Sequence, residues 1–163
     1  MEKFSSSLSH GKICFGKYPR QEEVDTIMNS GYRIFVDLTT SDEVTWPVYE
    51  LPPDIIYYSC PIKDRTPTAF DRDWFHELVN LLVTHIGDED KIYVHCRGGH
   101  GRSGMFAAII YALVENVSAT KALKDVYSSH QRRTEMDEKW RKMGAPQSRS
   151  QKAFVTSYLE DVV

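Results

Sequence analysis

Short runs of apolar residues alternate with helical patterns along most of the chain. Continuous β-branched and aromatic runs cover residues 32–38, 55–60 and 91–95, and each is short enough to be a buried strand. Residues 12–15 form a further short run of this kind. Apolar residues recur at helical spacing over longer stretches, which predicts helices over 21–30, 71–86, 105–114, 118–129 and 147–159.

The order of these elements predicts the fold class. Strands that alternate with helices indicate an α/β fold, with a central, mainly parallel sheet and helices on both faces. We expect residues 1–10, which are rich in serine, to be a flexible N-terminal arm, and residues 11–163 to form a single domain. Residues 39–53 carry Trp46 and three prolines, Pro47, Pro52 and Pro53, and are expected to be irregular. Ligands bind such sheets beyond the carboxyl ends of the strands.

Composition and charge narrow the function classes. The chain has 163 residues, 41% of them hydrophobic, and a formal net charge of −3, so general nucleic-acid binding is not expected. No apolar run approaches the ~18 residues of a membrane span, and we expect a protein that is neither membrane-spanning nor secreted. The three cysteines, Cys14, Cys60 and Cys96, lack the spacing of a disulfide framework, which indicates a reducing, cytoplasmic location.

A glycine-rich stretch, residues 94–104, stands between the strand at 91–95 and the buried helix at 105–114. Gly98, Gly99 and Gly101 allow the backbone to take positive φ and curl, so that successive amide N–H groups point to a common centre. The free N–H groups and the dipole of the following helix favour an anion at the same place. The stretch therefore predicts an oxyanion cradle.

Cys96 lies at the base of this cradle, and Arg102 follows after five intervening residues. A guanidinium holds two phosphate oxygens in a fork, which a lysine cannot do as well. A cysteine attacks as the thiolate, and electropositive surroundings favour that form. Because a helix N-terminus contributes only about 0.3–2 kcal/mol, we expect the loop amides and the Ser103 hydroxyl to add hydrogen bonds to the sulfur.

The pattern His-Cys, five residues, Arg-Ser, formed by His95, Cys96, Arg102 and Ser103, resembles the phosphate loop of the cysteine-dependent protein phosphatases. Within that superfamily the chain is most similar to the small dual-specificity phosphatases. The resemblance implies a protein tyrosine phosphatase-like fold and a phosphocysteine intermediate, with Cys96 as nucleophile, Arg102 as phosphate and transition-state ligand, and Ser103 helping the thiolate to leave. His95 would orient the loop. The loop residues that would bind the phosphate are Arg97, Gly98, Gly99, His100 and Gly101.

The Cys-to-Arg spacing is shared with rhodanese-like and arsenate-reductase-like proteins. The position of a general acid along the chain is therefore needed to distinguish these families. Expulsion of an alkoxide needs a proton at the leaving oxygen, and Asp64 is the best candidate, because Pro67 follows it as in the acid loop of the family. Asp64 precedes Cys96 by 32 residues, 96 minus 64. That order resembles the dual-specificity and classical tyrosine phosphatases. A turn-capping role is the alternative for Asp64.

Residues 147–151 resemble the glutamine loop of the classical tyrosine phosphatases, in which the first glutamine helps to place the hydrolytic water. The resemblance makes Gln147 a candidate for the second step and Gln151 a supporting residue, whereas a position on a solvated helix surface is the alternative for both. The chain lacks the length and the phosphotyrosine-recognition segment of the classical enzymes. Strict phosphotyrosine specificity is therefore not implied.

Positive charge near the cradle leaves the substrate open. Arg97 and His100 in the phosphate loop, and Lys63 and Arg65 in the acid loop, could serve a substrate with several phosphates or point away from the pocket. We therefore expect a phosphatase of phosphorylated proteins or small phosphomonoesters, with an inositol polyphosphate or phosphoinositide phosphatase as the alternative.

A non-catalytic phosphate-binding module is a third hypothesis, which the joint presence of Cys96, Arg102 and Asp64 disfavours. No metal or other cofactor is expected, because the cradle itself supplies charge stabilisation. The oligomeric state is left open.

Overall fold

A five-stranded sheet lies at the centre of the computed structural model, which describes residues 1–64 and 70–162. Its order is β1-β2-β5-β3-β4, with the bounds β1 (Ser5–Leu8), β2 (Ile13–Gly16), β3 (Ile34–Asp37), β4 (Ile56–Ser59) and β5 (Ile92–His95). β2, β5, β3 and β4 pair in parallel, while β1 runs antiparallel to β2. The expected mainly parallel sheet is thus confirmed.

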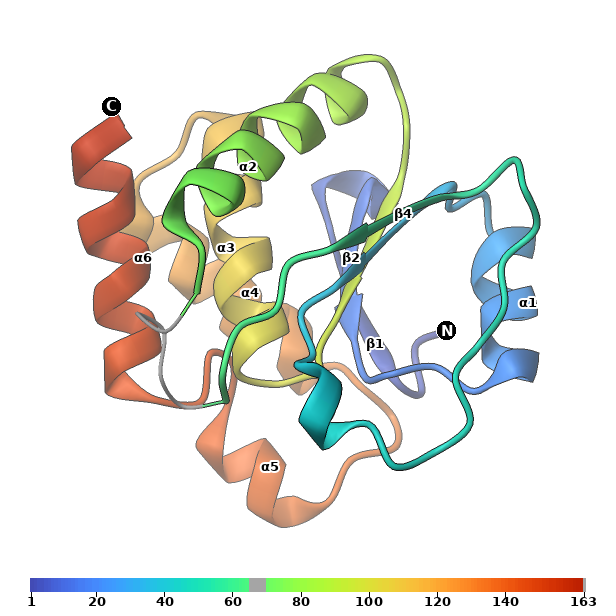
Figure 1. Cartoon of the computed structure of the whole chain (residues 1–163). Helices are drawn as coiled ribbons and strands as arrows, with labels where there is room; N and C mark the ends of the chain where they lie inside the picture. The colour runs from blue at the N-terminus through green and yellow to red at the C-terminus, as the bar shows by residue number, and fades with distance from the viewer. Residues whose placement is uncertain (65–69, 163) are drawn as a thin grey trace.

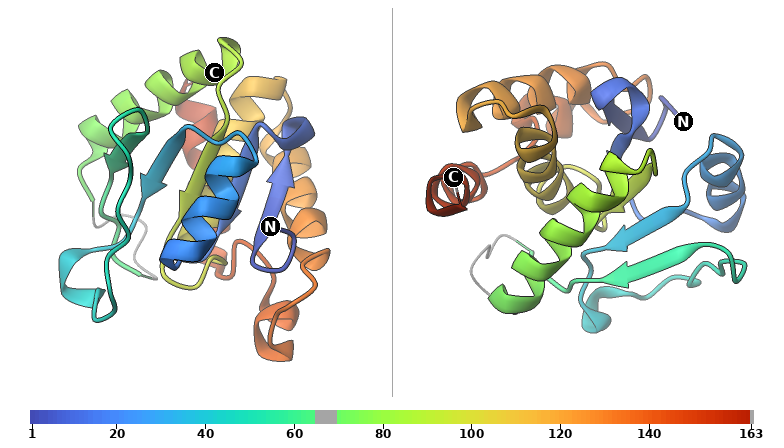
Figure 2. Two further views of the ribbon diagram at one scale, coloured as in Figure 1. Left: turned by 90° about the vertical axis from the view of Figure 1, so that its right-hand side faces the viewer. Right: turned by 90° about the horizontal axis from the view of Figure 1, so that it is seen from above.

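Helices cover both faces of the sheet, as predicted (Figure 1). One face carries α1 (Gln21–Asn29), and the opposite face carries α2 (Arg72–Gly87), α3 (Arg102–Glu115), α4 (Ala119–Gln131) and α6 (Arg149–Val162). A short helix, α5 (Glu138–Met143), lies at one end of the molecule (Figure 2). Two short 3-10 turns, Ser9–Gly11 and Ser41–Glu43, complete the described elements.

Helix α3 is the centre of the larger core. Ten of its residues, from Arg102 to Ile110 and Ala112, are buried, because the helix packs between the sheet and its neighbours α2, α4 and α6. Its run of alanine and isoleucine is apolar on nearly every side, which is the pattern of a helix enclosed by protein. The chain leaves the helix through Asn116, which takes the left-handed conformation with φ 53°. A smaller core on the other face lies under α1.

Two of the predicted helix starts are confirmed by their caps. The side chain of Asp71 accepts a hydrogen bond from the Trp74 N–H at 3.0 Å, and that of Ser118 accepts one from the Lys121 N–H at 3.1 Å. Each satisfies a backbone donor that the first turn of a helix leaves free. The Asp71 carboxylate therefore caps α2.

The prediction that residues 1–10 form a flexible arm is wrong for β1. Ser5–Leu8 pairs with β2 along its whole length, because backbone hydrogen bonds along an open strand do not depend on apolar side chains. Other polar contacts add to the pairing. The Ser129 hydroxyl donates to the Ser7 carbonyl at 2.8 Å, and the Arg133 Nε donates to the Ser6 hydroxyl at 2.8 Å.

The carboxyl ends of three neighbouring strands meet at one level of the sheet. Gly16, Asp37 and His95 end β2, β3 and β5, and the register places Gly16 and Asp37 on either side of His95. The segment 96–101 therefore begins at the edge where ligands bind in parallel sheets. Among the residues that the structure describes, no helix is long and apolar enough to cross a membrane.

Candidate active site

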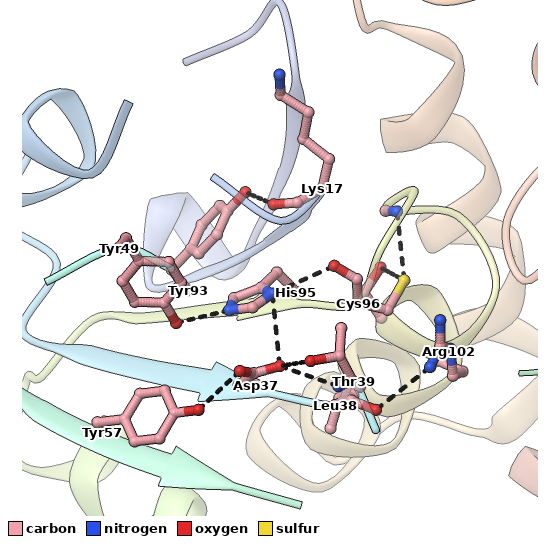
Figure 3. Close-up of polar contacts among 12 residues, drawn as sticks. Lys17, Asp37, Leu38, Thr39, Tyr49, Tyr57, Tyr93, His95, Cys96 and Arg102 are labelled. Atoms are coloured by element: carbon pink, nitrogen blue, oxygen red, sulfur yellow. Dashed lines mark hydrogen bonds and ion pairs between the residues drawn. The ribbon is translucent and has the colours of Figure 1, made fainter. Parts of the chain in front are cut away.

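Cys96 stands where β5 gives way to a tight loop that leads into α3 (Figure 3). Its sulfur accepts a hydrogen bond from the Gly99 N–H at 3.3 Å and lies 3.5 Å from the Ser103 Oγ. The residue is 3% exposed. The predicted hydrogen bond from a loop amide to the sulfur is present, and Ser103 is also in contact, with the Cys96 thiol donating to its hydroxyl oxygen.

Two of the loop glycines sit where a side chain would not fit. Gly99 has φ +83°, and a Cβ there would collide with the backbone of Gly16 and Lys17. Gly101 begins α3, and a Cβ there would lie 2.7 Å from the Gln151 side-chain nitrogen. The loop is thus pressed between the end of β2 on one side and the start of α6 on the other.

The guanidinium of Arg102 is held in a fork by a carboxylate from the segment after β3. Its two terminal nitrogens donate to the two oxygens of Glu43 at 2.6 and 3.0 Å. Nη1 also donates to the Ile62 carbonyl at 2.9 Å and reaches the Leu38 carbonyl at 3.4 Å. Such a bidentate pair fixes both the position and the plane of the guanidinium.

The charges of this pair are mutually stabilised. Burial alone would raise the pKa of Glu43, but hydrogen bonds from Arg102 and Thr40 lower it below the ordinary carboxyl value. Burial alone would lower the pKa of Arg102, but the hydrogen bond to Glu43, with charge effects from Cys96, Glu43 and Asp64, raises it. Arg102 therefore remains a cation at 2% exposure.

One donor of Arg102 is left over. Among the described residues, its Nε is buried and has no hydrogen-bond partner, and the Asp64 carboxylate lies at ion-pair distance, 3.7 Å away. A buried donor without an acceptor costs free energy on the order of 1–3 kcal/mol. The guanidinium and the Cys96 sulfur face the same space (Figure 3). An anion bound there would accept a hydrogen bond from Nε and so remove this cost.

His95 supports the loop from behind. It is fully buried, its Nδ1 donates to the Cys96 carbonyl at 3.2 Å, and its Nε2 accepts from the Tyr49 hydroxyl at 2.7 Å (Figure 3). Asp37 lies 3.9 Å from the same Nδ1 and accepts from the Thr39 N–H and hydroxyl at 2.9 and 2.6 Å. Burial lowers the pKa of His95, so the ring is neutral and orients the backbone of Cys96.

Asp64 lies at the open side of the site. Its side chain is 56% exposed, and its carboxylate is within ion-pair distance of Arg102. Lys63, beside it, is exposed. Arg65 and Pro67, the other residues of the expected acid loop, lie outside the described residues. An acid on the rim, above a buried cation, has access to a leaving group that points to solvent.

The side chain of His100 points away from the cradle. One of its ring nitrogens is hydrogen-bonded to His130 at 2.8 Å, and its ring stacks on Trp140 at 5.2 Å. Burial and the nearby Arg133 lower the pKa of His100 to about 4. His100 therefore packs the outer side of the loop as a neutral ring and does not supply the positive charge that its position indicated.

Arg97 also turns outward, onto the face of Trp46, with 5.2 Å between the guanidinium carbon and the ring centroid. Its main-chain carbonyl accepts a hydrogen bond from the Tyr18 N–H at 3.1 Å. The cradle itself is therefore lined by backbone amides and Arg102, and the Arg97 cation lies beside it.

Gln147, just before α6, and Gln151, in its first turn, both reach the loop. Their side chains lie over Gly101. The amide carbon of Gln147 is 3.2 Å, and the amide nitrogen of Gln151 is 2.7 Å, from the position that a Cβ on Gly101 would take. Gln151 is 1% exposed, its Oε1 accepts from the Ser148 N–H at 3.2 Å, and its Nε2 has no hydrogen-bond partner in the part of the chain that the structure describes. A helix-surface position is thus excluded for Gln151.

Sequence reasoning missed two residues of the site, Glu43 and Tyr49. Both lie in the irregular stretch after β3, which carries no periodic pattern, and they meet Arg102 and His95 only through the fold. A usable signal existed for Glu43, because a buried arginine needs a carboxylate partner and the loops at the carboxyl edge are the place to seek one.

The arrangement can hold a tetrahedral oxyanion next to a sulfur nucleophile. Donors converge from the loop backbone and Arg102, an acid stands on the rim, and amides of two glutamines lie over the far side. Within residues 1–64 and 70–162, no group of three or more histidine, cysteine, aspartate or glutamate side chains is placed to hold a metal ion.

Comparisons with known proteins agree with this chemistry. Residues 2–155 match the family model described as "PTP-SAK: Swiss Army Knife protein, DSP-PTPase phosphatase domain". Two viral proteins are 38% identical to the chain: "Putative tyrosine phosphatase 067L" of Invertebrate iridescent virus 3, over 90% of this chain, and "Putative tyrosine phosphatase 197R" of Invertebrate iridescent virus 6, over 76%. The chain spans 62% and 47% of the length of these relatives.

Solved structures share the fold at low sequence identity. Tk-PTP in its active form superposes with a TM-score of 0.72 at 20% identity, covering 98% of both chains. PTPMT1, solved in complex with PI(5)P, gives a TM-score of 0.70 at 14% identity and covers 98% of this chain and 99% of its own.

Proposed function

Because the chain belongs to the Swiss Army Knife protein DSP-PTPase phosphatase domain family, we propose that it hydrolyses phosphomonoesters through a phosphocysteine at Cys96. The family makes the chain a cysteine-dependent protein-tyrosine/dual-specificity phosphatase. As substrates we propose phosphotyrosine, phosphoserine and phosphothreonine in proteins, since the two viral relatives are named as tyrosine phosphatases.

One observation carries this proposal: the Arg102 Nε is a buried donor with no hydrogen-bond acceptor among the described residues, on a guanidinium that Glu43 holds in place beside Cys96. A cation held only for the fold would spend all of its donors on protein groups. Here the Glu43 carboxylate binds the two terminal nitrogens of the guanidinium and leaves Nε free to donate to a ligand. A phosphoryl oxygen at that position would complete the set.

In the first step, the Cys96 thiolate attacks phosphorus in line with the leaving oxygen. The S–P bond forms as the P–O ester bond breaks, and Asp64 transfers its proton to the departing oxygen. Loop amides and Arg102 hold the three remaining oxygens, whose charge grows in the transition state. The Ser103 hydroxyl stabilises the sulfur when it later leaves.

In the second step, water attacks the phosphocysteine. Asp64, now a carboxylate, takes a proton from that water, the O–P bond forms, and the S–P bond breaks to return the thiolate. We propose that Gln147 orients the water and that Gln151 supports it, because both amides lie over Gly101 on the far side of the loop. Inorganic phosphate then leaves the cradle.

The test is hydrolysis of p-nitrophenyl phosphate by matched cysteine variants. Cys96→Ser should reduce kcat by at least ~10³-fold, since loss of a covalent nucleophile is among the largest single effects known. Cys14→Ser is the control, because Cys14 is buried in the other core and has Ser5 and Tyr32 as polar neighbours that suit a hydroxyl. Retained turnover in a clean Cys96→Ser preparation would contradict the covalent route.

A second candidate, an inositol polyphosphate or phosphoinositide phosphatase, has one observation in its favour. A cavity of about 690 Å³ adjoins Gly98 of the phosphate loop. Its charged lining residues are four cations, Lys3, Lys17, Arg20 and Arg133, and three acids, Glu23, Glu135 and Asp137. This excess of positive charge would suit a polyanion. Inositol hexakisphosphate turned over faster than phosphopeptides would favour this candidate over the first.

We also propose that β1 belongs to the same catalytic domain as the chain from residue 11 onward. The strand pairs with β2, and the Arg133 guanidinium joins it to the segment after α4. Limited proteolysis should therefore leave residues 5–8 protected together with the sheet. Removal of these residues without loss of stability would contradict this domain boundary.

A further inference from the structure

A second cavity, of about 520 Å³, lies on the other side of the phosphate loop. Its walls come from the turn before α1, the segment 46–49 and one loop residue, Arg97. We propose that this cavity is a substrate subsite that takes an aromatic side chain within two residues of the phosphorylated residue in a peptide. We call it the aromatic subsite and define it by Tyr18, Gln21, Trp46, Val48, Tyr49 and Arg97. The inference rests on the proposed phosphatase function and names its substrate class.

The size and composition of the cavity fit a side chain. Small-molecule and side-chain pockets span about 300–1,000 Å³ and are lined mainly by apolar and aromatic groups. Tyr18 packs edge-on against Trp46 with 5.1 Å between ring centroids, and against Tyr49 at 5.2 Å. These rings hold one another in place, so a wall of fixed aromatic faces and edges is available to a further ring, which adds stacking to apolar burial.

Arg97 links the aromatic subsite to the cradle. It follows Cys96 directly in the phosphate loop and also lines the cavity, so it lies between the two sites. Its guanidinium lies on the Trp46 face, and no hydrogen bond or ion pair to it is found among the residues that the structure describes. Five N–H donors are therefore available to the main-chain carbonyls or an acidic side chain of a peptide between the two sites.

Two polar side chains of the cavity, Gln21 and Arg20, are already paired; among the described residues, its unpaired donors are the buried Trp46 Nε1 and the Arg97 guanidinium. The Gln21 amide donates to the Glu50 carbonyl at 3.0 Å and accepts from the Glu50 N–H at 2.7 Å. Arg20 is paired with Glu22 and Glu23. A base needs free donors and acceptors along its edge to be recognised, whereas a phenyl ring needs only apolar walls.

The floor of the subsite is coupled to the nucleophile. Tyr49 is 7% exposed, lines the cavity with one side of its ring, and donates its hydroxyl to His95, which in turn holds the Cys96 carbonyl. A ring bound against Tyr49 therefore rests on the same chain of contacts that orients the phosphate loop. Binding energy gained there can position the scissile phosphate.

The experiment compares phosphotyrosine peptides that differ at one position. Phenylalanine or alanine is placed at each of the two positions on either side of the phosphotyrosine, and kcat/KM is measured for each pair. We expect phenylalanine to raise kcat/KM by about five- to tenfold at one of these positions, mainly through KM. No preference at any of the four positions would overturn the subsite. If the subsite fails this test but hydrolysis of p-nitrophenyl phosphate still depends on Cys96, the proposed phosphatase function stands and only the subsite is wrong.

Variants then locate the preference. Val48 is 67% exposed at the rim, so Val48→Asp should fold and should reduce the phenylalanine-to-alanine ratio to about one. Trp46→Leu, which removes the ring under Arg97, should do the same. Val162→Asp is the matched control, because Val162 is exposed at the end of α6 on the opposite side of the molecule (Figure 1). A ratio unchanged in both subsite variants would overturn the assignment, whatever their overall activity.

Discussion

Two buried arginines lie beside the phosphate loop, and their charges are compensated in different ways. Arg102, 2% exposed, is forked by Glu43 and keeps one donor vacant. Arg133, 4% exposed, donates to the Ser6 hydroxyl and the Phe15 carbonyl and has no carboxylate partner among the described residues. The hydrogen bond to Glu43 raises the pKa of Arg102 against the effect of burial, whereas burial lowers that of Arg133 to about 10.

This difference shows how the fold separates catalysis from support. The Glu43 carboxylate balances the charge of Arg102 and fixes the plane of its guanidinium, so that Nε is positioned to donate to a bound anion. Arg133 spends its donors on β1 and β2 and ties the segment after α4 to the sheet. A buried arginine is thus not by itself a ligand site. Whether it has N–H donors that no protein group accepts is a better sign of anion binding than its charge.

The largest effect that would test this contrast comes from replacing each arginine by lysine. Arg102→Lys should lower kcat for p-nitrophenyl phosphate by about 10²–10⁴-fold, because a point charge cannot hold both Glu43 and the phosphate. Arg133→Lys should change kcat by less than about tenfold but lower the free energy of unfolding by about 1–3 kcal/mol. Equal losses of kcat in the two variants would erase the distinction.

The exposed acid should give the next largest effect. Asp64→Asn should slow hydrolysis of alkyl and peptide phosphates by about 10²–10³-fold and remove one limb of the pH profile. The loss in the first step should be smaller for p-nitrophenyl phosphate, whose leaving group needs little protonation. A uniform loss across leaving groups would show that Asp64 is not the proton donor.

Glu43→Gln removes the negative charge that balances Arg102 while it keeps the shape of the side chain. The amide keeps the size of the side chain but replaces one acceptor oxygen by an NH2 donor and removes the charge, so the fork with Arg102 is lost and we expect kcat to fall by about ten- to a hundredfold. The folded-state pKa of Glu43 is lowered below its ordinary 4.5, so the pair contributes stability above that pH and loses it as pH falls further. The wild type should therefore lose stability more steeply than Glu43→Gln below about pH 4.5. Parallel curves would contradict the pairing.

The smallest predicted effect lies on the outer side of the loop. Burial and Arg133 lower the pKa of His100 to about 4, and burial, Arg133 and His100 lower that of His130 to about 3. Both rings are neutral in the folded state, so their contribution is complete above the ordinary value of 6.5 and is lost as pH falls toward 4 and 3. We expect the wild type to lose on the order of 1–2 kcal/mol per ring between pH 7 and 5.

Denaturant unfolding at several pH values measures this slope. His130→Gln should flatten it, since an amide does not titrate. His76→Gln, at an exposed position of α2, is the matched control and should keep the wild-type slope. A slope that His130→Gln leaves unchanged would show that the histidine pair does not set the acid sensitivity.

The sequence predicts best what depends on neighbouring residues. Cys96, Arg102 and Ser103 stand on one loop and one helix turn, so their spacing alone indicated a common centre. The buried strands and the apolar helix α3 were readable because their patterns are local and strong. The caps at Asp71 and Ser118 follow from side chains three residues from their donors.

What the sequence could not predict depends on contacts made through the fold. Glu43 and Arg102 are 59 residues apart, and Glu43 sits in a segment without periodicity. The sequence left open whether His100 faces a substrate or points away from the pocket, because its pairing with His130 requires knowing where α4 ends. β1 was missed because its serines lack an apolar pattern, although the backbone alone is enough to pair with β2.

The most direct test of the central claim is to isolate the phosphoenzyme. Asp64→Asn should accept a phosphoryl group from p-nitrophenyl phosphate but be slow to hydrolyse it, because the second step lacks its base. Acid quenching followed by peptide mass spectrometry should then find close to one phosphoryl group per chain on the peptide that contains Cys96, together with a burst of p-nitrophenol. Continued turnover with no burst and no phosphate on that peptide would contradict the mechanism.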